Sequence, residues 1–279
     1  MTNADRDAPI GVFDSGLGGL TVVHALLDRL PVESLVYVGD TARVPYGPKS
    51  PDTVRRYAQQ IADFLVEQGV KAIIIACNTA TAHALDSLRL TIPVPLIGVI
   101  QPGARAAART TRGGPVGVIG TTGTIASGAY ERAIHAENPS IDVRAVACPL
   151  FVPLVEEGWV EHPATRLIAH DYLAPLRTAH VDTLVLGCTH YPLLAATLQA
   201  EMGAGVQLID SAAETAVETS RVLAERGLLC APTDGFATHG FARVPTHRFI
   251  ASDAPERFLT LGRRFLGSTI AKVEHITFA

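Results

Sequence analysis

Lysines are scarce in this sequence of 279 residues, and closely spaced pairs of cysteines and long apolar runs are missing. No apolar run approaches the roughly 18 residues of a membrane-spanning helix, so we expect no membrane span. The sequence has no run of basic residues and a net charge of −4, which argues against nucleic-acid binding as a main function. The first residues lack the basic and apolar parts of a signal peptide, which predicts a cytoplasmic protein.

The few cysteines and lysines disfavour several kinds of cofactor site. Cys77, Cys148, Cys188 and Cys230 lie far apart and form neither a CxxC motif nor a zinc-finger pattern. A pyridoxal phosphate enzyme needs a lysine for its Schiff base, and only Lys49 lies near a candidate loop. We therefore expect chemistry that needs neither a metal nor an organic cofactor.

The residues that are present predict a well-packed α/β protein. Apolar residues make up 48% and charged residues 18%, a balance that excludes disorder. Short apolar segments beginning at residues 10, 35, 72 and 95 alternate with amphipathic segments at 21–30, 51–68 and 79–88. This alternation is typical of a parallel sheet that helices cover on both faces.

The pattern restarts near residue 102. PVGVIGTTGTIASGAY, from residue 115, is similar to IGVFDSGLGGLTVV, from residue 10, and this match aligns Gly11-Val12 with Gly117-Val118 at an offset of 106. TLVLGCTH is likewise similar to AIIIACNT, and this match aligns Cys77 with Cys188 at an offset of 111. We interpret the chain as two related α/β halves.

The last 70 residues predict a helix at 212–226, a strand at 247–251 and a helix at 255–266. Because these elements are too few for a third core, we expect the tail to complete the first half. The predicted domains are residues 1–100 with 211–279, and residues 101–210. A ligand cleft is expected between them.

Four polar loops come after predicted strands. Ligands of open parallel sheets bind outside the carboxyl ends of the strands. The candidate loops are therefore Asp14-Ser15-Gly16, Pro45-Tyr46-Gly47, Cys77-Asn78-Thr79 and Cys188-Thr189-His190.

Two cysteines at equivalent strand ends suggest proton transfer. Inversion of a stereocentre needs a base on one face and an acid on the other, and a thiolate and a thiol can exchange these roles. Core packing is the ordinary explanation for a buried cysteine, but it explains the equivalent placement of Cys77 and Cys188 less well. We therefore favour a paired function.

The other polar candidates have structural explanations as well. Asp14 can cap a helix, or it can orient a base or hold a substrate ammonium group. His190 lies two residues after Cys188, which favours a role as acid, base or substrate contact. For four further residues the sequence pattern alone does not favour a functional role over a structural one. Tyr46 could be a turn residue, Asp40 a strand-end cap, and Glu156 and Glu157 an exposed charged pair.

Eight stretches between Gly11 and Ala212 together resemble one known family. They are GVFDSGLGGLTV, GDTARVPYGPKS, ACNTATA, IGVIQPGA, GTTGTIASGAY, CPLFVPLVEEG, LGCTHYPLL and LIDSA. The chain is similar to the glutamate racemases of the cofactor-independent aspartate/glutamate racemase superfamily. Gln101 departs from the family pattern, in which glutamate is frequent.

The resemblance implies that the protein interconverts L- and D-glutamate without a cofactor and supplies D-glutamate for peptidoglycan. It also implies two flavodoxin-like domains related by pseudo-symmetry, with the active site between them, and a homodimer. By motif position, Cys77 would deprotonate D-glutamate with help from Asp14, and Cys188 would deprotonate L-glutamate with help from His190. The implied substrate-binding residues are Asp14, Ser15, Tyr46, Gly47, Asn78, Thr79, Thr189 and His190, and Asp40 and Glu156 match accessory acidic positions.

Two alternatives stay open at this point. Another member of the superfamily, such as an aspartate racemase, a hydantoin racemase or a maleate isomerase, could also use paired cysteines, although VPYG and CTHYPLL favour glutamate. The second alternative is a two-domain amino-acid-binding protein. Such a protein would have no need of two thiols at equivalent strand ends.

Overall fold

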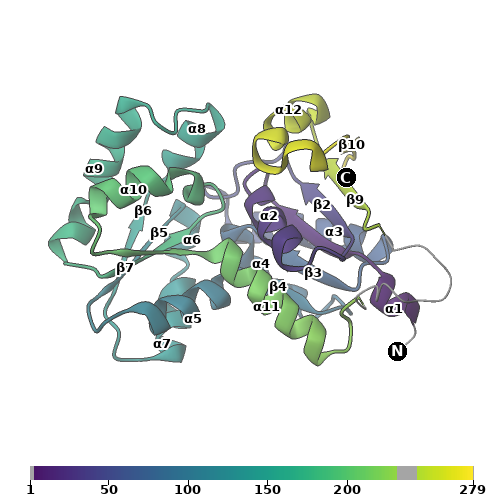
Figure 1. Ribbon diagram of the computed structural model, residues 1–279, viewed down its shortest axis with the longest axis horizontal. Coiled ribbons are helices and arrows are strands. Elements are labelled where there is room, and N and C mark those ends of the chain that lie inside the picture. Colours follow the sequence, from purple (N-terminus) through teal and green to yellow (C-terminus); the bar gives the residue numbers. More distant parts are fainter. Residues whose placement is uncertain (1–2, 231–243, 279) are drawn as a thin grey trace.

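Two parallel sheets, one in each lobe, form the framework of the computed structural model, which describes residues 3–230 and 244–278 (Figure 1). The first sheet has the order β10-β9-β2-β1-β3-β4 and the second has the order β6-β5-β7-β8. The strands of the first sheet are β1 (Ile10–Asp14), β2 (Leu35–Gly39), β3 (Ala72–Ile75), β4 (Leu96–Gly98), β9 (His247–Ala251) and β10 (Glu274–His275). Those of the second are β5 (Val116–Gly120), β6 (Val143–Ala147), β7 (Thr183–Gly187) and β8 (Gln207–Asp210).

Helices cover both sheets. The first lobe contains α1 (Asn3–Asp7), α2 (Leu20–Arg29), α3 (Pro51–Glu67), α4 (Asn78–Leu88), α11 (Ser211–Glu225), α12 (Pro255–Leu266) and the short 3-10 helix η2 (Gly267–Thr269). The second contains α5 (Ile100–Thr110), α6 (Thr122–Ala126), α7 (Ala129–Glu137), α8 (Phe151–Glu156), α9 (Pro163–Thr178), α10 (Ala195–Met202) and the 3-10 helix η1 (Tyr191–Leu194). The helices expected from the apolar spacing are confirmed to within one residue at each end.

The segment near residue 100 differs from the sequence-based prediction. The expected strand from residue 95 to residue 100 is only Leu96–Gly98 in the structure, because α5 begins at Ile100. Pro102 lies in the first turn of this helix, where the missing N–H of a proline costs no helical hydrogen bond. The point near residue 102 at which the sequence pattern begins to repeat therefore falls inside a helix. At the other end of the chain, β10 is a strand that the pattern did not predict.

The two lobes repeat one arrangement. The order β2-β1-β3-β4 in the first sheet matches β6-β5-β7-β8 in the second, which confirms the predicted pair of similar α/β halves. Cys77 comes after β3 and Cys188 comes after β7, so the two thiols occupy equivalent positions. In each sheet the chain starts at a central strand, β1 or β5, adds the next strand on one side, and places the following two strands on the other side. Ligands of such sheets bind where the strand order changes sides in this way.

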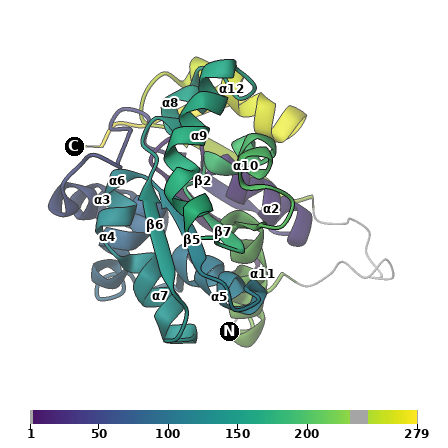
Figure 2. The same cartoon turned by 90° about the vertical axis from the view of Figure 1, so that its left-hand side faces the viewer.

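The central strands of each sheet are buried on both faces, because parallel strands need helices on both sides, whereas the edge strand β6 is partly exposed. Along β3, Ile74 packs toward α2, α11 and α12, whereas Ile73 and Ile75 pack toward α3 and α4. In the second sheet, α9 and α10 pack on one face and α5 and α7 on the other (Figure 2). The burial of the central strands makes their carboxyl ends the places where polar side chains can gather.

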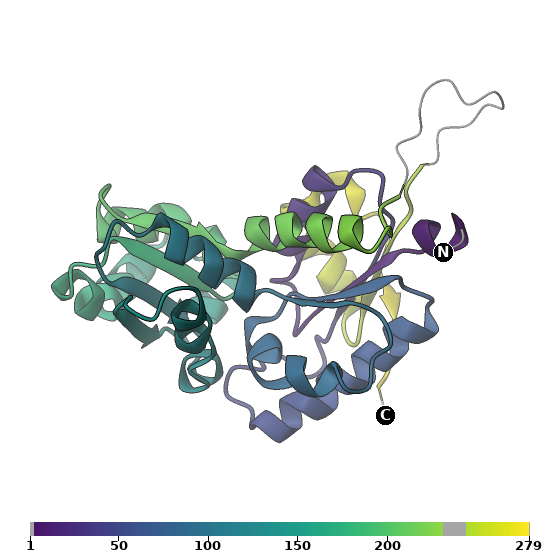
Figure 3. The same ribbon diagram turned by 90° about the horizontal axis from the view of Figure 1, so that it is seen from below.

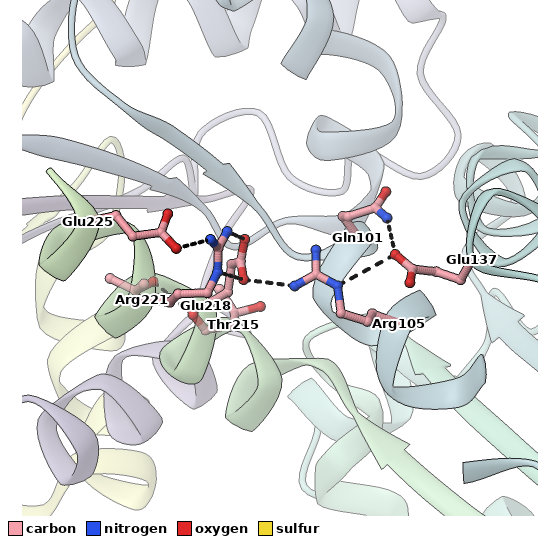
Figure 4. A network of polar contacts seen from close by, with 8 residues as sticks. Gln101, Arg105, Glu137, Thr215, Glu218, Arg221 and Glu225 are labelled. Atoms are coloured by element: carbon pink, nitrogen blue, oxygen red, sulfur yellow. Dashed lines mark hydrogen bonds and ion pairs between the residues drawn. The ribbon is translucent and has the colours of Figure 1, made fainter. Parts of the chain in front are cut away.

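The chain crosses between the lobes twice, from β4 into α5 and from β8 into α11 (Figure 3). Ion pairs join the crossing helices (Figure 4). Arg105 Nη1 on α5 lies 2.9 Å from Glu218 Oε2 on α11, and its Nε lies 3.5 Å from Glu137 Oε1 on α7. Gln101 donates to the same Glu137 oxygen at 2.9 Å, and Arg221 pairs with Glu218. Gln101, the one departure from the family pattern, is thus a neutral donor beside a carboxylate.

The tail returns to the first sheet. Strand β9 pairs in parallel with β2, and β10 pairs with β9. The division into residues 1–100 with 211–279, and 101–210, stays a prediction that this pairing supports. Residues 1–2, 231–243 and 279 of the first domain lie outside the described residues. Within the described ranges, no helix combines the length and apolar character needed to cross a membrane.

Candidate active site

The four predicted loops meet at one cavity between the lobes. The first lobe contributes Ser15, Val44, Pro45, Tyr46, Gly47, Cys77, Asn78 and Thr79, and the second contributes Thr121, Val152, Cys188, Thr189 and His190. Both predicted thiols and seven of the eight predicted substrate-binding residues therefore line it. The eighth, Asp14, does not line the cavity itself, and neither do the accessory candidates Asp40 and Glu156; all three contact residues that do.

Cys77 sits at the N-cap of α4. Its Sγ accepts the N–H of Ala80 at 3.4 Å and lies 3.7 Å from Ser15 Oγ. Burial and the charge of Asp14 raise the pKa of the Cys77 thiol to about 12, although the Ala80 and Ser15 hydrogen bonds act in the opposite direction. At neutral pH this residue therefore carries its proton and can act as an acid.

Cys188 has a different environment. Its Sγ lies 3.9 Å from Nδ1 of His190, whose Nε2 lies 3.1 Å from Oε1 of Glu156. Burial disfavours the charged imidazole, but the hydrogen bonds to Cys188 and Glu156 and the charges of Cys188 and Asp14 outweigh it and raise the pKa of His190 to about 10. A positive imidazolium thus adjoins the sulfur of Cys188.

Asp14, fully buried at the end of β1, connects the two lobes. Its Oδ2 accepts the N–H of Gly16 at 3.0 Å, and Thr189 Oγ1 donates to its Oδ1 at 3.5 Å from the other lobe. Burial raises the pKa of Asp14, while the charge of His190 acts against this effect. Helix α2 begins at Leu20 and has Gly19 as its N-cap, so Asp14 is not the capping residue, although its carboxylate interacts with the N–H of Gly19.

Asp40 holds the loop that carries Tyr46. The Tyr46 hydroxyl and Arg43 Nε both donate to Oδ2 of Asp40, the latter at 2.7 Å, and Ser252 Oγ donates to Oδ1 at 2.8 Å. These contacts bring the tail, through Ser252, to the back of the cavity wall. Asp40 is therefore an anchor for Tyr46, which packs with 1% of its surface exposed.

A cluster of threonine hydroxyls closes the other side of the cavity. Thr79 Oγ1 lies 2.9 Å from Thr121 Oγ1 and 3.1 Å from Thr124 Oγ1 across the lobe interface. The sequence-based prediction missed Thr121 and Thr124. The internal repeat held a usable signal for the first, since Thr121 lies 106 positions after Ser15, the offset of the two opening strands.

Glycines let the lobes approach closely. A Cβ atom at Gly18 would lie 2.2 Å from Thr189 Oγ1 and 2.6 Å from His190 Nδ1, and one at Gly47 would lie 2.8 Å from Thr121 Cβ. The cavity between the thiols measures about 20 Å³, close to the space for one water molecule. This conformation therefore leaves little room for an amino acid, and the lobes are closed on each other.

The chemical groups of the cavity suit an amino-acid zwitterion. No lysine or arginine is among the lining residues that the structure describes. Apart from the His190 imidazole, whose nitrogens face Cys188 and Glu156, the donors for carboxylates are hydroxyls, an amide and backbone N–H groups. The residues described contain no group of three or more histidine, cysteine, aspartate or glutamate side chains suited to a metal ion. The two walls carry one thiol each, an arrangement that can remove a proton on one face and deliver one on the other.

Comparisons with known proteins show the family to which the chain belongs. The family model Asp/Glu/Hydantoin racemase matches residues 15–219. A glutamate racemase of Neisseria meningitidis serogroup A is 51% identical over 278 residues, which cover 99% of both chains. The crystal structure of a Bacillus anthracis glutamate racemase isoform is 40% identical, with a TM-score of 0.90 and coverage of 97% and 98%. That of a Francisella tularensis glutamate racemase in complex with D-glutamate is 39% identical, with a TM-score of 0.88 and coverage of 98% of each chain.

Proposed function

Because the chain belongs to the Asp/Glu/Hydantoin racemase family, we propose that it interconverts L- and D-glutamate with its two buried thiols. The observation that carries the proposal is the placement of Cys77 and Cys188 on opposite walls of one cavity. The relative from Neisseria meningitidis, which matches over nearly the full length, bears the name glutamate racemase. The product would supply D-glutamate for peptidoglycan.

In the L-to-D direction, the Cys188 thiolate removes the α-proton of glutamate and the Cys77 thiol delivers its own proton to the opposite face. The result is D-glutamate, a Cys188 thiol and a Cys77 thiolate, and the reverse direction starts from this state. The imidazolium of His190 supports the thiolate of Cys188, and Asp14 assists Cys77. The high pKa of Cys77 and of His190 supports this starting state.

The α-proton of an amino acid is very weakly acidic, so the cavity must stabilise the carbanionic charge that develops. Hydroxyls, the Asn78 amide and backbone N–H groups at strand ends are fixed dipoles in a closed and dry site, where they are most effective. We assign substrate binding to Ser15, Tyr46, Gly47, Asn78, Thr79, Thr189 and His190, with Asp14 behind them. Asp40 and Glu156 act through Tyr46 and His190.

We further propose that no cofactor takes part, that the protein acts in the cytoplasm, and that it forms a homodimer, as the family resemblance implies. The molar mass in solution tests the last point against the 29.5 kDa of one chain. A mass equal to that of one chain would contradict the dimer but would leave the racemase proposal intact.

Circular dichroism of purified protein with L- or D-glutamate tests the main proposal. The protein is first dialysed against a chelator, no cofactor is added, and L- and D-aspartate serve as rival substrates. We expect racemisation of glutamate from both sides and little or none of aspartate. Binding of glutamate without turnover would instead favour an amino-acid-binding protein, preferred turnover of aspartate would favour a different racemase, and a requirement for added metal or pyridoxal phosphate would contradict the cofactor-free mechanism.

A further inference from the structure

One buried donor in the cavity wall has no partner within the protein. The Nδ2 atom of Asn78 is buried and forms no hydrogen bond, and the residue as a whole is 2% exposed. The other such atoms in the described residues belong to Arg43, Arg177 and His247, none of which lines this cavity. An unpaired buried donor is costly, so the amide of Asn78 is built to meet an acceptor that enters the cavity.

A tyrosine from the other lobe determines which end of this amide faces inward. Tyr130 Oη, on α7, donates to Asn78 Oδ1 at 2.7 Å across the lobe interface. Ser211, at the crossing into α11, acts on this phenol by lowering its pKa. Because the phenol donates its proton to Asn78, Oδ1 is occupied and Nδ2 is left to meet a group in the cavity.

The phenol is a donor over the whole working pH range. Burial raises the pKa of Tyr130 above its ordinary value, and the Ser211 hydrogen bond only partly offsets this effect. The hydroxyl therefore stays protonated at neutral pH and in moderately alkaline solution. Without this hydroxyl, the Asn78 amide could rotate by a half turn and present its oxygen to the cavity, where it would repel a carboxylate.

We propose that Tyr130 is a positioning residue for the racemisation reaction, orienting the Asn78 amide so that Nδ2 donates to a carboxylate of glutamate. The absence of lysine and arginine from the described lining makes each neutral donor important for holding a dicarboxylate. The inference rests on the proposed placement of glutamate in this cavity. It adds a residue that does not itself line the cavity and that acts from the opposite lobe.

The ring of Tyr130 also packs in the core, and the test must separate the two roles. A Cβ atom at Gly187 would lie 2.9 Å from Tyr130 Cε2, so the ring fills the space beside β7. Tyr130→Phe keeps this ring and removes only the hydroxyl. Tyr172→Phe is a matched control in the same lobe, because Tyr172 packs edge-on against Phe151 and lies outside the cavity lining.

The experiment is a double-mutant cycle of Tyr130→Phe and Asn78→Ala, with KM and kcat for L- and D-glutamate and urea unfolding of each variant. We expect Tyr130→Phe to raise KM about tenfold, the effect of one misdirected hydrogen-bonding group, with a smaller change in kcat. In the Asn78→Ala background, Tyr130→Phe should change KM by less than about twofold, because its target is gone. Tyr172→Phe should leave both constants unchanged.

Three results would overturn the proposal, and each has a different meaning. If Tyr130→Phe raised KM equally with and without Asn78, it would act by another route. If it lowered the stability against urea but left KM unchanged, its role would be packing alone. If Asn78→Ala itself left KM unchanged while racemisation continued, the carboxylate would bind elsewhere, whereas a lack of racemisation in the unmodified protein would refute the proposed function itself.

Discussion

Nε2 of His190 lies 3.1 Å from Oε1 of Glu156, on the side of the imidazole ring opposite Cys188. A carboxylate, an imidazole and a thiol therefore follow one another in a row. Sites with activated nucleophiles use the same order, in which a third group orients the base beside the nucleophile. Glu156 does not line the cavity. Its effect on the reaction must therefore pass through His190.

Glu156→Gln should weaken the charged state of His190. The hydrogen bonds to Cys188 and Glu156 help to raise the pKa of His190 to about 10, so the imidazolium persists until the pH rises through that value. Without the carboxylate, we expect the alkaline fall in the L-to-D rate to move to lower pH by about one pH unit or more. The pH profile of kcat measures this shift.

Glu157→Gln is the matched control, since this neighbouring carboxylate is exposed and lies 3.8 Å from Arg257. An unchanged profile in Glu156→Gln would refute the role of the contact. The raised pKa of His190 also stabilises the folded state, fully below the ordinary pKa of 6.5, and this contribution is lost as the pH rises toward 10. Unfolding in urea across that range should show a smaller loss of stability in Glu156→Gln than in the unmodified protein.

Asp14→Asn and His190→Asn should affect the two directions unequally. Asp14 is proposed to assist Cys77, so its loss should slow the D-to-L reaction more, and loss of His190 should slow the L-to-D reaction more. The equilibrium constant fixes the ratio of kcat/KM values, so the asymmetry must appear in kcat and in isotope effects, with KM compensating. Equal changes in both directions would show that neither residue serves one thiol in particular.

Replacement of either Cys77 or Cys188 by alanine should abolish racemisation, because each direction needs an acid and a base. The fold should survive at a cost of about 1–2 kcal/mol. Cys148→Ala is the matched control: it is also buried but lies outside the cavity lining, and this variant should keep its activity. Near-parental turnover in either of the first two variants would assign that cysteine to core packing.

In heavy water, a two-base site should label the product and spare the substrate. Each inversion takes the substrate proton on one face and delivers deuterium from the thiol on the other. Mass spectrometry early in the reaction should find deuterium at the α-carbon of the product and almost none in recovered glutamate. Labelling of substrate and product at equal rates would mean that one base serves both faces.

Gly18→Ala should hinder closure of the lobes. The added methyl group would lie 2.2 Å from Thr189 Oγ1 in the closed structure, and such overpacking typically costs about 1–3 kcal/mol. If that cost falls on the closed state alone, kcat/KM should drop about 5- to 150-fold. Gly205→Ala, where nothing lies within 4 Å of the new atom, is the control, and normal kinetics in Gly18→Ala would show that turnover does not need this contact.

Local patterns in the sequence were sufficient to predict the elements and the loops that carry the thiols. The spacing of apolar residues depends on the local geometry of a helix or strand, and for this reason the predicted helices at 51–68 and 255–266 match α3 and α12. The repeat of AIIIACNT as TLVLGCTH was enough to place Cys77 and Cys188 at equivalent strand ends. Parallel sheets bind ligands at the loops after their buried strands as a property of the fold class, so these loops could be identified as well.

The contacts that give each site residue its chemistry depend on the packing of the two lobes. Glu156 reaches His190 from 34 positions earlier in the chain, and Tyr130 reaches Asn78 from 52 positions later. No local period encodes such pairs. The first depends on how α8 packs against the loop after β7 within the second lobe, and the second depends on how α7 meets α4 across the lobe interface. The sequence by itself determined which groups are available and at which edge of the sheets they lie. Only the tertiary structure decided that Cys77 is paired with Ser15, that Cys188 adjoins a charged imidazole, and that one amide donor of Asn78 is left unpaired in the cavity.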